Sequence, residues 1–247
     1  MNLSSEVSGS TPPIGETGPR CPYCSFDLHK KPGRKKSCPQ CKNDIYVRTR
    51  PQDNAKVLIR EDQIVLIDEQ WSKKNGTHDQ FLAAQQRRQS VVASLTRKFG
   101  RPPSTSDVEW AILNDDSLEH AKQMDWGYYR NARFAMAEIL SKEGRLEQAL
   151  NFYLEVCYLD LNGPSNCGGI RDPQIRKDFP LFNPKDGMLA SGVLGRIHDI
   201  VDKSEGQFTI AEDRFMKVAI PIYNSLRLPL SPDKAWAKFR CEFTAME

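Results

Sequence analysis

The chain has 247 residues, 39% of them hydrophobic and 27% charged, which is enough for one large globular domain or two smaller ones. No apolar run approaches the ~20 residues that a membrane-spanning helix needs, so we expect no membrane association. The net charge of +3 is unevenly distributed, because residues 20–50 carry +7 and the remainder carries −4.

Residues 1–19 form a tail rich in Ser, Gly, Pro and Thr, with little apolar surface to bury. We expect this tail to have no fixed structure. It contains Glu6 and Glu16 and lacks the apolar stretch of a secretory signal. We therefore expect a cytoplasmic protein.

Four cysteines follow in two pairs, Cys21-Pro-Tyr-Cys24 and Cys38-Pro-Gln-Cys41, with 13 residues between the pairs. Two tight turns of this kind aim four thiolates at one point, as in a tetrahedral structural zinc site. Disulfides are the alternative, and a chain without a secretory signal disfavours them. Iron fits the same sulfurs, but the lysine-rich loop between the pairs offers a redox centre little apolar shielding. We predict one structural Zn²⁺ with no open coordination position, which argues against metal-assisted hydrolysis.

The segment Arg20–Arg50 resembles a zinc ribbon of the CPxC type. The resemblance implies short β elements around the metal, and the alternating run Ile45–Arg50 fits the final strand. Many such knuckles have glycine directly after the second cysteine of a pair, where the backbone is left-handed. Ser25 and Lys42 stand there instead, and Asn43 is an alternative left-handed residue beside the second pair. Because the segment is too small to fold by apolar burial alone, we expect the metal to supply much of its stability.

The ribbon segment is also strongly basic. Seven residues form the predicted binding surface: Lys30, Lys31, Arg34, Lys35, Lys36, Arg48 and Arg50. Charge of this density attracts phosphates and releases counterions, which favours DNA or RNA as the partner. Tyr23, Phe26 and Tyr46 offer faces for stacked bases, although Phe26 fits better in the small core. A protein partner, or a solvated loop with no partner, is the alternative.

Residues 51–76 are predicted to connect the ribbon to a helical domain. Val57–Ile59 is expected to form a short strand. The run Glu61–Trp71 begins apolar and becomes acidic, so it suits either a second strand of a hairpin or a helix ended by Asn75-Gly76. We favour the helix.

Residues 77–247 show helical periodicity almost throughout and form the predicted helical domain. Caps and breakers place helices at Thr77–Phe99, from Ser106 or Asp107 through Leu113, at Trp126–Glu143, at Arg145–Cys157, at Gln174–Lys177, after Asn183-Pro184, at Thr209–Leu226 with a kink at Pro221, and after Ser231-Pro232. The predicted fold class is a small zinc ribbon plus a mainly α, irregular bundle of helical hairpins.

The hairpin expected at 126–161 resembles one tetratricopeptide repeat over about 34 residues. The matching positions are Ala149, Tyr153, Val156 and the turn glycine Gly144. Met136 and Leu161 depart from the family pattern, and an insertion at 162–187 displaces the next hairpin. The resemblance implies a protein-interaction surface on a bundle that is TPR-like in part, whereas a plain pair of packed helices is the alternative.

Candidate catalytic groups are few. Cys157 lies on an apolar stripe, which indicates a core residue, and Cys167 beside Gly168-Gly169 has no identifiable base. The sequence has no P-loop, dinucleotide-binding or HExxH motif. We predict a non-enzymatic zinc-ribbon protein that binds nucleic acid through the ribbon and a protein partner through the helical domain. The alternative is a protein-interaction adaptor that uses the ribbon as a docking element.

Overall fold

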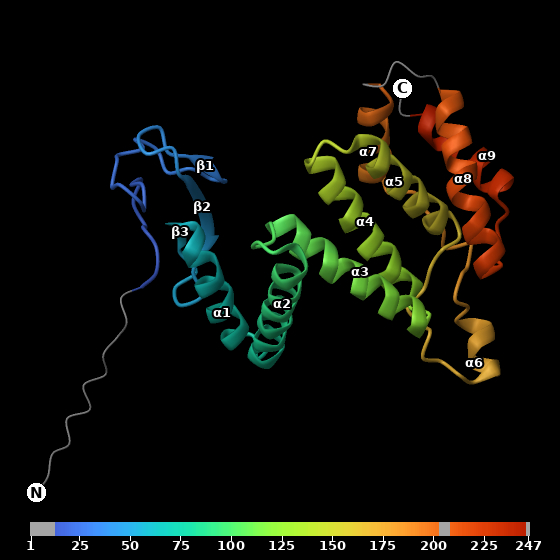
Figure 1. Cartoon of the computed structure of the whole chain (residues 1–247), viewed down its shortest axis with the longest axis horizontal. Coiled ribbons are helices and arrows are strands. Elements are labelled where there is room, and N and C mark those ends of the chain that lie inside the picture. The colour runs from blue at the N-terminus through green and yellow to red at the C-terminus, as the bar shows by residue number, and fades with distance from the viewer. Residues whose placement is uncertain (1–12, 203–207, 246–247) are drawn as a thin grey trace, which may run out of the picture. The chain divides into compact units, whose positions relative to one another are not determined.

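A computed structural model describes residues 13–202 and 208–245 of the chain (Figure 1). The chain divides into two compact units, Met1–Gln89 (unit 1) and Ser90–Glu247 (unit 2). The described residues are mainly helical, and unit 1 contains a three-stranded antiparallel sheet. The coarse fold class, mainly α with short β elements beside the cysteines, is therefore confirmed.

The sheet of unit 1 follows chain order. Its strands are β1 (Lys36–Ser37), β2 (Asp44–Thr49) and β3 (Lys56–Ile59). Ile45 lies opposite Lys36, and Arg48 lies opposite Val57. Both predicted strands are confirmed, each beginning one residue earlier than expected.

The two faces of this sheet are covered by different parts of unit 1, because side chains alternate along a strand. One face packs against the cysteines through Ile45, Val47 and Leu58. The other face packs against helix α1 (Ile64–Lys74) through Tyr46, Val57 and Ile59. The sheet thus joins the candidate metal site to the first helix.

Part of the N-terminal tail also lies on the sheet. Residues 1–12 are outside the described residues, but Glu16 pairs with Leu58 through backbone bonds of 2.9 and 2.8 Å. Ile14 packs beside Ile59, and Gly15 has φ +87° with no room for a Cβ. Residues 13–19 therefore differ from the expected unstructured tail, because strand β3 has a free edge and apolar side chains to cover.

The ambiguous run after β3 is helical. A 3₁₀ turn at Glu61–Gln63 leads into α1, and Ile67 on α1 is fully buried against the sheet. The helical interpretation is confirmed. Helix α2 (His78–Phe99) follows as predicted, and none of its described side chains is buried.

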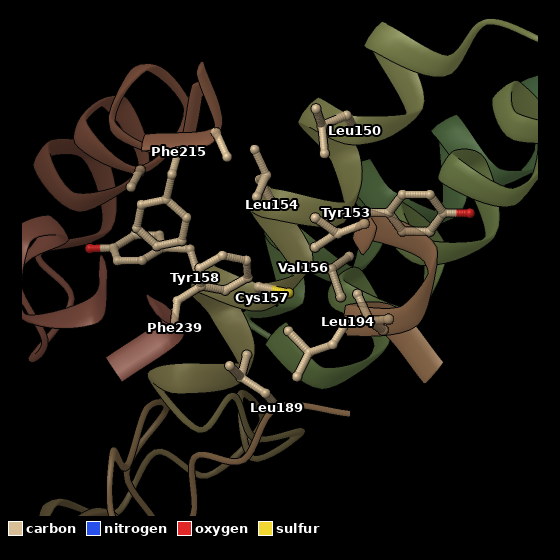
Figure 2. Packing of buried hydrophobic residues seen from close by; sticks show 14 of the residues in the cluster. Leu150, Tyr153, Leu154, Val156, Cys157, Tyr158, Leu189, Leu194, Phe215 and Phe239 are labelled. Carbon is tan, nitrogen blue, oxygen red and sulfur yellow. The ribbon is translucent and has the colours of Figure 1, made fainter. Parts of the chain in front are cut away.

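Unit 2 is built around helix α5. Its helices are α3 (Thr105–Gln123), α4 (Trp126–Lys142), α5 (Leu146–Leu161), α6 (Pro173–Asp178), α7 (Ser191–Val201), α8 (Phe208–Leu226) and α9 (Pro232–Thr244). Residues 153–159 of α5 are all buried, so this helix is enclosed on every side. Figure 2 shows Tyr158 and Cys157 of α5 beside Phe215 of α8 and Phe239 of α9.

Three helix starts differ from their predictions or fall at the edge of the described residues. The cap of α3 is Ser104, which forms a capping box with Asp107, whereas Ser106 or Asp107 was expected. Helix α7 begins at Ser191, because Asn183 bonds to Asp186 and closes a turn. The cap expected at Thr209 involves a side chain outside the described residues.

Helices α4 and α5 form the hairpin predicted at 126–161. Gly144 adopts φ +75° at the turn, as a left-handed stop requires. Ala149, Tyr153 and Val156 are fully buried. A tetratricopeptide repeat is not confirmed by this hairpin, because any well-packed helix pair buries such positions.

The insertion 162–187 is packed closely against unit 2. Asp172 caps helix α6 by accepting the N–H of Gln174 at 2.8 Å, as its Asp-Pro start predicted. A Cβ on Gly168 would lie 1.7 Å from the Gln123 carbonyl oxygen. Gly163 and Gly187 lie similarly close to backbone atoms. Glycine is required at these contacts because the insertion approaches the helices with its backbone.

Candidate metal centre and basic loop

Two matching turns carry the four cysteines. The Cys21 carbonyl accepts the N–H of Ser25 at 2.9 Å, and the Cys38 carbonyl accepts the N–H of Lys42 at 3.0 Å. Ser25 and Lys42 have φ of 59° and 62°. Each turn therefore has its left-handed residue directly after the second cysteine, although neither residue is glycine. The prediction that Asn43 is left-handed instead is wrong.

The sulfur atoms of these turns converge. The Sγ atoms of Cys21 and Cys41 are 3.8 Å apart, as are those of Cys24 and Cys38. All four Sγ atoms lie within 4.8 Å of one another. A tetrahedron of sulfurs about 2.3 Å from a central metal has edges of about 3.8 Å, whereas a disulfide needs about 2.05 Å. The four cysteines therefore lie together as a possible metal site.

The surroundings of the sulfurs favour a cation at their centre. Burial raises the pKa of the Cys21 thiol to about 12, since a thiolate there loses its hydration. At Cys38, burial also raises the pKa, but bonds from the backbone N–H groups of Cys41 and Gln40 outweigh it and lower the pKa to about 6. Four thiolates need positive charge to offset their mutual repulsion, and a bound metal ion supplies it.

The aromatic residues of the segment have structural contacts. Phe26 packs with Leu28 against the buried Cys21 and Cys38, as expected. The Tyr23 hydroxyl accepts the backbone N–H of Glu61 at 2.9 Å. Lys35 lies over the Tyr46 ring, 4.8 Å from its centroid. The Tyr23 hydroxyl thus joins the ribbon to the turn before α1, and the Tyr46 ring packs on the α1 side of the sheet.

Arg50 differs from the other predicted binding residues because it is buried, with 5% of its surface exposed. It bonds to Asp53 in a bidentate pair, Nε–Oδ1 3.1 Å and Nη2–Oδ2 2.6 Å. Its Nη1 donates to the Ile14 carbonyl at 3.1 Å. We correct its assignment: Arg50 holds the chain segments of unit 1 together and is not available to a partner.

Two predicted lysines are engaged within unit 1. Lys31 donates to the backbone carbonyls of Thr17 (2.9 Å) and Lys56. Lys35 forms an ion pair with Asp44 at 2.7 Å, which raises the pKa of Lys35 and lowers that of Asp44. Both ammonium groups are therefore partly satisfied by the protein itself.

Five of the seven predicted basic residues are exposed, and all of these except Lys35 lack an ion pair among the described residues. Lys30, Arg34 and Lys36 form no hydrogen bond or ion pair with another described side chain, and Arg48 reaches only the Val47 carbonyl at 3.1 Å. The strand register places Lys36 and Arg48 on opposite sheet faces. The free charges are thus concentrated in the loop between the cysteine pairs.

The other cysteines of interest lie in unit 2. Cys157 is fully buried, which raises its pKa well above the ordinary value and keeps the thiol protonated. Cys167 lines a pocket with Asp160, whose carboxylate is held by Arg130 at 2.7 and 2.6 Å. No histidine is among the described residues that line this pocket.

Ion pairs between α4 and α5 were not predicted from the sequence. Arg133 donates to both carboxylate oxygens of Glu155 at 2.8 and 2.6 Å, and the Tyr129 hydroxyl donates to the same carboxylate at 2.9 Å. In the sequence, these pairs are indicated by polar residues that interrupt the otherwise apolar face of each helix. They align the hairpin, because each buried charge needs its partner.

No family model, curated protein or solved structure matches the chain. Among the helices of residues 13–202 and 208–245, none is long and apolar enough to span a membrane.

Proposed function

We propose that the four cysteines bind one structural zinc ion and that the loop between them binds nucleic acid through its phosphates. The observation that carries this proposal is the exposure of Lys30, Arg34 and Lys36 beside the four-sulfur site without protein partners. Binding, not catalysis, is the proposed role, and reduced thiols at the metal site fit a cytoplasmic location.

Zinc is favoured over iron by the environment of the sulfurs. Cys24 is exposed and the adjoining loop is rich in lysine, so the apolar enclosure that tunes a redox centre is incomplete on this side of the site. Four thiolates close the coordination shell, which suits a structural role.

Metal analysis tests the zinc assignment. The full chain, purified without chelator, is expected to contain about one zinc per molecule, and Cys38→Ser with Cys41→Ser is expected to abolish this content. A chain that is free of metal with an intact sheet, or that contains iron, would refute the assignment.

The loop is expected to bind with little sequence preference. Lysine and arginine side chains on a loop reach phosphate oxygens, which carry no base information. Lys30, Arg34 and Lys36 are the principal contacts, with smaller contributions from Arg48, Lys31 and Lys35. Three to four phosphate contacts predict a slope of about −2 to −4 for log affinity against log salt, from single strands to duplex.

Fluorescence anisotropy with labelled single-stranded and duplex oligonucleotides tests this binding. We expect the charge reversal Lys30→Glu/Arg34→Glu/Lys36→Glu to weaken binding more than tenfold. The matched control reverses three exposed charges on α9: Lys234, Lys238 and Arg240. Equal weakening by both triple variants, or binding insensitive to salt, would refute the assignment to the ribbon.

A protein adaptor is the second candidate, favoured by a groove of about 470 Å³ in unit 2. Leu95, Phe99 and Trp110 line it, with charged residues of both signs around them. We expect an adaptor to keep its protein partners after the ribbon charge reversal and to lose them after Phe99→Glu. If the ribbon charge reversal abolishes binding of the protein partners while Phe99→Glu does not, this candidate is contradicted.

A further inference from the structure

A second basic site lies in unit 2, where the insertion meets the C-terminal end of α3. An open pocket of about 690 Å³ is present there. Its lining residues come from these two segments and include Lys122, Asp125, Gly168, Arg171 and Arg176. The close contact of Gly168 with the Gln123 carbonyl fixes the two walls together.

Positive charge predominates in this lining. Lys122, Arg171 and Arg176 contribute three cations, and Asp125 contributes the one carboxylate among the described lining residues. That carboxylate already accepts the backbone N–H of Gly168 at 3.2 Å. The pocket therefore has a net charge of +2, in contrast to the acidic balance of the chain outside the ribbon.

Arg176 has an unused donor inside the protein. Its Nη2 donates to the carbonyls of Gly168 (3.2 Å) and Ile170, which orders the glycine turn. Its Nη1 is buried and has no hydrogen-bond partner among the described residues. Buried guanidinium N–H groups nearly always have an acceptor, so this N–H is available to an acceptor that binds in the pocket.

We propose that the pocket binds a phosphoryl group, with Arg171 and Lys122 facing the anion and Arg176 supplying its unused donor after a small adjustment. A water molecule would satisfy Nη1 but would leave the excess of positive charge in the lining without a counter-ion, because among the described lining cations only Lys122 has a second carboxylate nearby, that of Glu119 at 3.7 Å. A phosphoryl group carries about two negative charges and several acceptor oxygens, which matches this excess better than a single carboxylate. The group belongs either to a small phosphorylated molecule or to a nucleic-acid backbone, and neither source depends on the ribbon loop.

Calorimetric titration of the full chain with inorganic phosphate and pyrophosphate tests the site. We expect Lys122→Gln with Arg171→Gln to raise the Kd for pyrophosphate at least tenfold. Both side chains are exposed, so this variant keeps the fold. Lys185→Gln, an exposed lysine of the same insertion outside the pocket lining, is the matched control and is expected to change the Kd less than twofold. Arg176→Lys is a further variant, checked for folding by circular dichroism.

Three results would overturn the proposal: no binding at 10 mM pyrophosphate, unchanged binding by the double variant, or equal affinity for chloride, which indicates an adventitious ion only. A second experiment distinguishes the two sources of the phosphoryl group. It uses the full chain with the ribbon charges reversed. Oligonucleotide binding that pyrophosphate displaces indicates a backbone phosphate. Pyrophosphate binding without oligonucleotide binding indicates a small phosphorylated molecule. Either source supports the site, whether or not the ribbon loop binds nucleic acid.

Discussion

The carboxylate of Glu138 in α4 accepts two hydrogen bonds from Arg196 in α7, Nε–Oε1 2.9 Å and Nη2–Oε2 3.2 Å. The Tyr153 hydroxyl of α5 donates to the same carboxylate at 2.5 Å. Three helices of unit 2 are thus joined at one charged group. The bonds from Arg196, together with the weaker effect of the bond from Tyr153, stabilise the ionised form and lower the pKa of Glu138 despite its partial burial.

Glu138→Gln is expected to destabilise unit 2 in a pH-dependent way. Because the folded pKa lies below the unfolded value of about 4.3, the stabilisation is present above that pH and is lost as the pH falls through the folded pKa. We expect the free energy of unfolding to fall by about 1 kcal/mol at pH 7 and by less at pH 3. The value at pH 7 is modest because the Arg196 side chain is 51% exposed to solvent.

Urea unfolding followed by tryptophan fluorescence measures this difference. The Trp71→Phe background confines the signal to unit 2, where the other three of the four tryptophans lie. If Glu138→Gln lowers the free energy of unfolding equally at pH 7 and pH 3, the ionised carboxylate does not stabilise unit 2.

Removal of the metal is expected to unfold the sheet of unit 1 selectively. The apolar cluster around Cys21 and Cys38 is small, so we expect a bound metal to supply much of its stability. After treatment with a chelator, amide NMR signals of β2 are expected to lose their dispersion while the helical circular dichroism of unit 2 persists. Added zinc is expected to restore the signals. Retention of the β2 signals without metal would contradict this dependence.

Lys42→Gly is expected to stabilise the ribbon by about 1 kcal/mol, because a residue with a Cβ is strained at φ 62°. Lys42→Ala is the control, since it also removes the bond from Nζ to the Pro39 carbonyl but keeps the strain. The urea midpoint of zinc release to a coloured chelator measures both variants. Equal midpoints for the two variants would show that the backbone is not strained at this turn.

Gly168→Ala is expected to destabilise unit 2 by more than about 2 kcal/mol, because the new Cβ would overlap the Gln123 carbonyl. Gly169→Ala is the matched control, since no atom lies within 4 Å of its Cβ position. Thermal unfolding of unit 2 is expected to separate the two variants clearly. Similar melting temperatures would show that the insertion is not held by this contact.

We expect the Asn162 side chain to stabilise the core of unit 2 at the end of α5. Its side chain donates to the Tyr158 carbonyl and accepts the N–H of Leu230, both at 2.9 Å, inside the core. Asn162→Leu leaves that N–H without a partner, which we expect to cost about 1–3 kcal/mol in urea unfolding. Asn151→Leu on the same helix is the control, because the Asn151 side chain bonds to no described residue. An equal loss in both variants would contradict this assignment.

Local signals in the sequence were sufficient for most of the elements and for the cysteine cluster. Gly144, Asp172-Pro173 and Ser231-Pro232 mark helix ends correctly, because caps and stops act within one turn of the backbone. The two cysteine pairs converge for the same reason, since each short turn aims its own two sulfurs. The start of α7 at Ser191 and the cap of α3 at Ser104 were not predicted, because a turn and a neighbouring cap residue, respectively, took the place of the expected caps.

The chain's own sequence therefore determined where charge and sulfur are concentrated, whereas the tertiary structure decided which charges are free. Arg50 and Lys31 belong to the basic segment by position, yet their donors bind the carbonyls of Ile14 and of Thr17 and Lys56, respectively. Arg176 and Lys122 are 54 residues apart in the sequence but line one pocket. Such pairings depend on backbone groups and segments brought together from a distance, which local spacing does not encode.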